Sequence, residues 1–234
     1  MKITFRCPPE LEPILPRPIA AREGLPEWLR AMPASAPWPD GGGDIRTVKQ
    51  CPPFLDAMTC GFLIPLAADV HVTGGTFSWD WNPPPATLGR YTRSPIGFHV
   101  IEQATGSPLY EDDTLIVKFN NFWTITLPEG YSLLCGHPFN RAELPFRTLT
   151  GLVDADRYGD GLIHFPACWH DPDFEGVLPA GTPVAQCVPV AREALELVFE
   201  TLSGEAAERF VETRRAIEEE TGAYRKKYRA PRRP

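Results

Sequence analysis

Proline is the residue that most restricts the fold of this chain. The sequence contains 27 prolines and 19 glycines among 234 residues. Proline lacks the backbone N–H and disrupts helix interiors, so such a chain favours short strands and turns. The longest stretch without proline begins after Pro189, and there the sequence takes on a helical pattern. We therefore expect a mainly β protein whose longer helices lie at the C-terminal end.

The chain divides into three parts on this basis. Residues 1–44 are rich in proline and predict an extended arm that wraps the core. Residues 45–190 contain short apolar runs separated by turns, which is typical of a small β domain. Residues 191–234 predict two helices, at 191–202 and 205–221, followed by a basic tail.

Composition narrows the class of protein further. The chain is 43% hydrophobic, which is enough for a packed core. No apolar run is long enough for a signal peptide or a membrane span, so we expect a cytoplasmic protein without a membrane segment. The six cysteines contain no CxxC pair and are expected to be free thiols.

Charge is distributed unevenly along the chain. The formal net charge is −7, yet six of the 23 basic residues lie in the last ten positions. The rest of the chain is strongly acidic, which does not favour nucleic acid as a partner. The basic tail is expected to be solvated or folded back on acidic surface.

An acidic turn carries the clearest chemical signal. The sequence GLVDADRYG at 151–159 places Asp154, Asp156 and Tyr158 just after an apolar run. A carboxylate beside an aromatic ring can orient a water molecule and hold a planar base. The alternative is that both aspartates only form the turn through bonds to their own backbone.

This turn resembles the third motif of the dUTPase and dCTP deaminase superfamily. The sequence FEGVLPAGTPVAQ at 174–186 resembles a later strand of that family. Over residues 123–190 the resemblance implies a β-clip or related small barrel core. It implies that Asp154 lies at the position of a water-activating aspartate and Tyr158 near the base-stacking aromatic. The family's phosphate-binding serine has no counterpart in the sequence HPFNR at 137–141.

Further residues could complete a ligand pocket. Asn140, Arg141 and Arg147 can bind a carboxylate or phosphate. Trp123 could line a barrel mouth together with the aromatic run at 77–81. The alternatives are that the aromatic rings fill the core and that Arg141 pairs with an acidic neighbour. These patterns predict binding or processing of a small anionic, nucleotide-like molecule, with catalysis at Asp154 and Asp156.

Two other classes of function remain open. In the first, His137, His164 and His170 hold a divalent metal, Mg or Fe, in an oxygenase of the double-stranded β-helix type. In the second, the chain is a non-enzymatic interaction protein or homo-oligomer that uses the helix at 205–221 and the basic tail. The chain also resembles a family of uncharacterised proteins from bacteria and tailed phages, through PEWLRAMP, CPPFLDAMTCGF and GAYRKKYR. That resemblance implies no activity.

Overall fold

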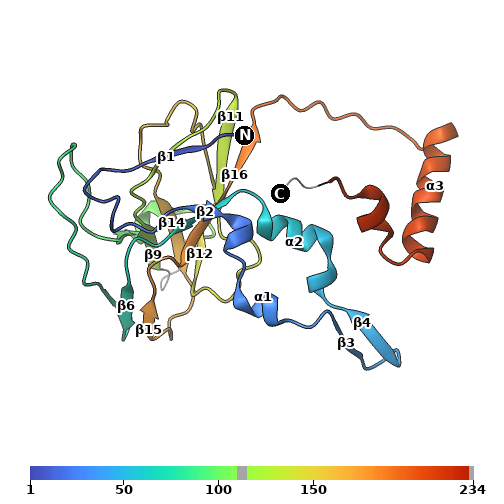
Figure 1. The fold of residues 1–234 in the computed structure, drawn as a ribbon, viewed down its shortest axis with the longest axis horizontal. Helices are drawn as coiled ribbons and strands as arrows, with labels where there is room; N and C mark the ends of the chain where they lie inside the picture. Colours follow the sequence, from blue (N-terminus) through green and yellow to red (C-terminus); the bar gives the residue numbers. More distant parts are fainter. Residues whose placement is uncertain (110–114, 232–234) are drawn as a thin grey trace. The chain divides into compact units, whose positions relative to one another are not determined.

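The computed structural model describes residues 1–109 and 115–231 (Figure 1). The chain forms two compact units. The first, here called the β unit, combines Met1–Met32 with Asp56–Arg192. The second, here called the helical unit, combines Pro33–Leu55 with Glu193–Pro234.

The β unit consists of short antiparallel strands joined by turns. The elements are β1 (Thr4–Arg6), β2 (Ile19–Ala20), η1 (Ala21–Glu23), α1 (Glu27–Ala31), β5 (Phe62–Pro65), β6 (Val70–Thr73), β7 (Thr76–Ser78), β8 (Ile96–His99), η3 (Ile101–Ala104), β9 (Leu115–Phe119), β10 (Thr124–Thr126), β11 (Tyr131–Gly136), β12 (Phe146–Thr148), β13 (Gly151–Val153), β14 (Phe165–Trp169), β15 (Gly176–Leu178) and β16 (Pro183–Ala191).

Two sheets form the body of the β unit. The larger has five strands in the order β13-β11-β16-β5-β2, and the other has the order β12-β14-β9-β8. β16 lies in the middle of the five-stranded sheet, where Cys187 faces Cys135 of β11 and Phe62 of β5. Two smaller sheets, β15-β6-β7 and β1-β10, complete the unit.

Apolar side chains that alternate along these strands fill one core. Along β9, for example, Val117 and Phe119 point inward, and the ring of Phe119 packs against that of Phe146 with centroids 4.6 Å apart. A second, smaller cluster joins the N-terminal arm to the chain before β10. Its buried members are Leu11, Leu15, Ala67, Phe122 and Trp123. The arm therefore belongs to the β unit up to Met32.

The helical unit has little β structure. The hairpin of β3 (Ser35–Trp38) and β4 (Gly43–Arg46) is followed by a 3-10 turn, η2 (Val48–Gln50). The helix α2 (Pro52–Thr59) begins in this unit and ends in the β unit. The C-terminal part contains α3 (Gly204–Glu219) and a π-helical turn, Tyr224–Tyr228.

The mainly β fold is confirmed, and α3 closely matches the helix predicted at 205–221. The helix predicted at 191–202 is wrong, because β16 continues through Ala191 and residues 192–203 are neither helix nor strand. A helix of that length is marginal without a surface to cover its apolar face. Among the described helices, none has the length and apolar character needed to cross a membrane.

Candidate functional site

The acidic turn lies at the end of β13, as the sequence motif predicts. The backbone N–H groups of Arg157 and Tyr158 both donate to the carbonyl oxygen of Asp154, at 2.9 and 2.8 Å. Gly161 N–H in turn donates to the carbonyl of Tyr158 at 3.1 Å. These bonds close a tight turn that projects the side chains of Asp154, Arg157 and Tyr158 outward, and all three residues are exposed.

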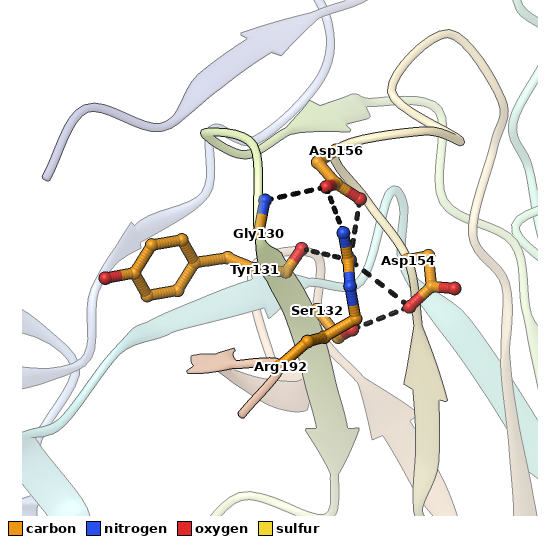
Figure 2. A network of polar contacts seen from close by, with 6 residues as sticks. All are labelled: Gly130, Tyr131, Ser132, Asp154, Asp156 and Arg192. Atoms are coloured by element: carbon orange, nitrogen blue, oxygen red, sulfur yellow. Dashed lines mark hydrogen bonds and ion pairs between the residues drawn. The ribbon is translucent and has the colours of Figure 1, made fainter. Parts of the chain in front are cut away.

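The second aspartate of the turn is bound on both oxygens (Figure 2). Arg192 Nη1 donates to Asp156 Oδ1 at 2.8 Å, and Nη2 donates to Oδ2. Gly130 N–H donates to the same Oδ2 at 3.0 Å. The Asp156 side chain is only 4% exposed. The hydrogen bonds from Arg192 hold the pKa of Asp156 well below its usual range. Asp156 is thus placed to hold Arg192 and the start of β11 together.

The first aspartate of the turn, Asp154, has one carboxylate oxygen in the hydrogen-bond network and the other open to solvent. Ser132, which is fully buried, donates from Oγ to Asp154 Oδ1 at 2.6 Å, and Arg192 Nη1 lies 3.4 Å from the same oxygen. The Asp154 side chain is 57% exposed. Figure 2 shows its second oxygen pointing away from the network. The arrangement orients a carboxylate that can still accept a hydrogen bond from a ligand or a water molecule.

Asn140 and Arg141 lie far from this turn. Arg141 lines a hollow that includes Pro183, the first residue of β16, and forms an ion pair with Glu143. Asp154 instead contacts Arg192, which directly follows the last residue of β16. The nine residues of β16 separate these two places by on the order of 25–30 Å. Asn140 adopts a left-handed backbone, with φ of 59°, in the turn beside Arg141.

Trp123 packs in the smaller cluster and also lines a hollow beside the N-terminal arm, together with Phe5, Cys7 and Pro18. The residue is 8% exposed, and its Nε1–H donates to the carbonyl oxygen of Pro16 at 3.0 Å. Its ring therefore fastens the N-terminal arm to the β unit. The aromatic residues at 77–81 pack against two different clusters. Phe77 and Trp79 pack against the main core, and Trp81 packs against Phe122 of the smaller cluster.

The three predicted metal-binding histidines do not meet at one point. His164 and His170 lie at opposite ends of β14. Both ring nitrogens of His137 contact backbone: Nδ1 accepts from Thr148 N–H at 3.3 Å, and Nε2 lies 2.9 Å from the carbonyl of Arg141. Burial lowers the pKa of His137 and of His164. Across residues 1–109 and 115–231, no group of three or more His, Cys, Asp or Glu is arranged to hold a metal.

A cavity with an aromatic wall lies at the end of β14. Its volume is about 540 Å³, within the range of small-molecule sites. The rings of Phe77 and Trp169 meet edge to face in its wall, with centroids 4.8 Å apart. Trp169 Nε1–H donates to the carbonyl oxygen of Asp171 at 2.7 Å, which fixes the indole. The other lining residues are Val72, Gly75, Pro108, Leu109, Leu115, Cys168, His170 and Pro172.

Polar groups border this cavity on one side. His170 is exposed, and its backbone N–H donates to the carbonyl of Pro145 at 3.1 Å. Arg147 of β12 is directly opposite Cys168 of β14, so its side chain projects from the face of the sheet opposite to that of Trp169 and lies outside the lining of the cavity. Arg147 is exposed. An aromatic wall beside an imidazole, which can donate a hydrogen bond, suits a planar ring that carries a negative group.

The sequence motif did not identify Trp169 as part of a site. Pro166 interrupts the apolar run, and proline is rare in inner strands. The alternation of Phe165, Ala167 and Trp169 could have predicted this strand and the position of Trp169, because these three side chains share the core-facing side of β14.

Comparison with known proteins finds similarity in structure but not in sequence. No protein-family model and no curated protein sequence matches the chain. In structure, the chain is distantly similar to phage dUTPases. The dUTPase of Staphylococcus bacteriophage 80alpha, in a mutant form with dUpNHpp, has a TM-score of 0.27 at 16% identity, covering 46% of this chain and 91% of that chain. A mutant dUTPase from phage phi11 of S. aureus has a TM-score of 0.27 at 14% identity, covering 48% of this chain and 99% of that chain.

Proposed function

We propose that the protein binds a small molecule that combines a planar ring with an anionic group, as a nucleotide does. The observation that carries the proposal is the cavity at the end of β14. Its wall offers the rings of Phe77 and Trp169 to a planar group. His170 lies on the side from which an anionic group would enter.

The energetics favour this cavity over a flat surface. Stacking of a planar ligand on an aromatic side chain contributes about 1–3 kcal/mol per base in nucleic-acid-binding proteins. The wall is already organised, because Trp169 also packs edge to face on Phe174, with centroids 5.6 Å apart. A preformed wall lowers the entropy cost of binding.

The experiment is a titration of the full chain with nucleoside monophosphates and triphosphates, followed by calorimetry and by tryptophan fluorescence. Free nucleosides and inorganic phosphate test the ring and the anion separately. We expect nucleotides to bind more tightly than either part alone. The substitution His170→Ala should weaken binding about tenfold, since it removes an exposed polar group from the cavity lining. Arg147→Ala, on the other face of the sheet, is the control and should leave binding unchanged. If no nucleotide binds the wild-type chain, the proposal is wrong.

A second place for the same function is the acidic turn. Asp154 offers an exposed carboxylate that is oriented by buried Ser132, and Arg157 and Tyr158 are exposed beside it. A ring N–H could donate to Asp154, the ring could pack on Tyr158, and Arg157 could pair with the anion. Catalysis at this place would use Asp154 rather than Asp156, whose oxygens are both bound.

Matched substitutions separate the two places. Asp154→Asn and Arg157→Ala test the turn, while Asp160→Asn removes an exposed carboxylate from the same turn as a control. We expect all three variants to bind nucleotide like the wild type if the ligand occupies the cavity. Loss of binding in Asp154→Asn alone, with Asp160→Asn unchanged, would transfer the site to the turn.

A further inference from the structure

The segment after β16 exposes apolar side chains that no part of the chain within residues 1–109 and 115–231 covers. Residues 192–203 are neither helix nor strand. In this segment Leu195 is 88% exposed, Val198 68% and Phe199 90%. Leu197 and Leu202 are also exposed. Monomeric proteins rarely leave such a dense run of large apolar side chains in water.

The sequence of this segment is helical even though its conformation is not. Leu195, Val198, Phe199 and Leu202 are spaced by three, one and three residues, which would place them on one face of a helix. The following helix, α3, also presents apolar side chains to solvent: Phe210, Val211 and Ile217 are 48%, 54% and 49% exposed. A short helix at 193–202 would be stable only against a surface that buries this face.

The apolar surface is large enough for a stable dimer. Seven large apolar side chains lie on these faces: Leu195, Val198, Phe199, Leu202, Phe210, Val211 and Ile217. At roughly 60–120 Å² of buried surface for each, they supply about 400–850 Å² per chain. A stable interface uses about 800 Å² from each partner.

Charge identifies the partner as a second copy in the opposite orientation. Residues 193–208 contain five glutamates and no basic residue. Residues 221–229 contain four basic residues, Arg225, Lys226, Lys227 and Arg229, and no acidic residue. Two copies placed antiparallel would bring the acidic segment of each chain to the basic segment of the other. Parallel copies would bring like charges together.

We propose that two copies of the chain associate antiparallel through residues 193–229, and that residues 193–202 become helical as they associate. The contact is isologous, so each chain provides the same surface to the other. The ordering of 193–202 is coupled to association, since its apolar face is buried only in the dimer.

The first experiment measures mass and helicity of the full chain across the micromolar concentration range, by light scattering and circular dichroism. We expect a monomer–dimer equilibrium in which helix content rises with the dimer. The double substitution Leu195→Ala, Phe199→Ala should weaken dimerisation at least tenfold. Leu88→Ala, at a leucine that is 65% exposed in the β unit, is the matched control and should leave it unchanged. A chain that stays monomeric throughout, with or without helix at 193–202, overturns the proposal.

A charge exchange tests the orientation. One variant carries Glu196→Lys and Glu200→Lys, and the other carries Arg225→Glu and Lys226→Glu. Each alone should dimerise more weakly, because like charges then face each other. Mixed together they should form heterodimers, because both contacts regain opposite charges. Heterodimers no more stable than either homodimer would contradict the antiparallel arrangement.

Discussion

The side chain of Gln186 ties three segments of the β unit together. It is 2% exposed, and its Oε1 accepts from Phe139 N–H at 2.9 Å. Its Nε2 donates to the carbonyls of Ala57 and Cys60, at 2.9 and 2.7 Å. A single amide on β16 thus holds the end of α2 and the loop after β11.

We expect Gln186→Ala to destabilise the chain by about 3 kcal/mol, because Phe139, Ala57 and Cys60 each lose the backbone hydrogen bond that the buried amide makes. Chemical denaturation followed by circular dichroism measures the loss. The exposed Gln103 provides the control, since Gln103→Ala should change the free energy of unfolding by less than about 0.5 kcal/mol. Equal effects of the two substitutions would mean that the buried amide contributes no more than a surface one.

Two half-buried histidines make stability depend on pH. Burial lowers the pKa of His137 and of His164 below 6.5, their usual value. The unfolded chain therefore binds more protons than the folded chain between the folded pKa values and 6.5. Stability from these groups is fully present above the unfolded pKa and decreases as pH falls through the folded pKa values.

The Tm should accordingly fall between about pH 7 and about pH 5. The double substitution His137→Gln, His164→Gln should lower the Tm overall and flatten this slope. His71→Gln changes an exposed histidine and should keep the wild-type slope. Identical slopes for the wild type and the double variant would assign the pH dependence to other groups.

At the scale of elements, the junction between α2 and β5 depends on the lack of a side chain at Gly61. This residue has a φ of 69°, and a Cβ there would lie 2.0 Å from the carbonyl oxygen of Cys187 on β16. Gly89 has a similar φ of 64° but has nothing within 4 Å of the position of a Cβ. Substitutions at these two glycines therefore distinguish the cost of a left-handed backbone, which both share, from the cost of a steric clash, which only Gly61 has.

We expect Gly89→Ala to cost about 1 kcal/mol, which is the strain of a left-handed alanine. Gly61→Ala should cost at least about 3 kcal/mol, since β16 and β5 must also move apart. Thermal and chemical denaturation measure both. A Gly61→Ala variant no less stable than Gly89→Ala would show that the junction can widen freely.

The sequence predicts an element or a side chain's environment when residues close in sequence determine it. The prediction fails when the environment depends on a contact with a residue far away in sequence. The motif at 151–159 identifies both aspartates, yet it cannot tell the buried one from the exposed one. Arg192, which makes that difference, is 36 positions away from Asp156. Similarly, Pro166 argues against an inner strand, but the carbonyl of Pro166 accepts from Leu149 N–H at 2.8 Å just beyond the end of β12. The β-clip assignment and the nucleotide remain predictions.

At the scale of the whole molecule, the boundary between the two units falls at a residue that the β unit needs. Arg192 is the last residue of the β unit, and its guanidinium neutralises buried Asp156. Its backbone N–H also donates to Gly130 at 2.9 Å. The β unit should therefore tolerate removal of everything after Arg192 but not of Arg192 itself.

We expect a chain of residues 1–192 to keep the Tm of the β unit, and a chain of residues 1–190 to melt several degrees lower. The substitution Arg192→Ala in the full chain isolates the side chain and should account for part of that difference. Differential scanning calorimetry measures all three. If 1–190 and 1–192 melt together, the Arg192–Asp156 contact does not stabilise the β unit.

The place of β16 in its sheet sets the order in which the chain can fold as it is made. β16 is the middle strand of the five-stranded sheet, yet it is the last of those strands to leave the ribosome. β5 and β11 are synthesised much earlier, and each has an open hydrogen-bonding edge until Pro183–Ala191 emerges. The sheet therefore closes only after translation has passed Ala191, and until then those edges are open to pairing with other chains.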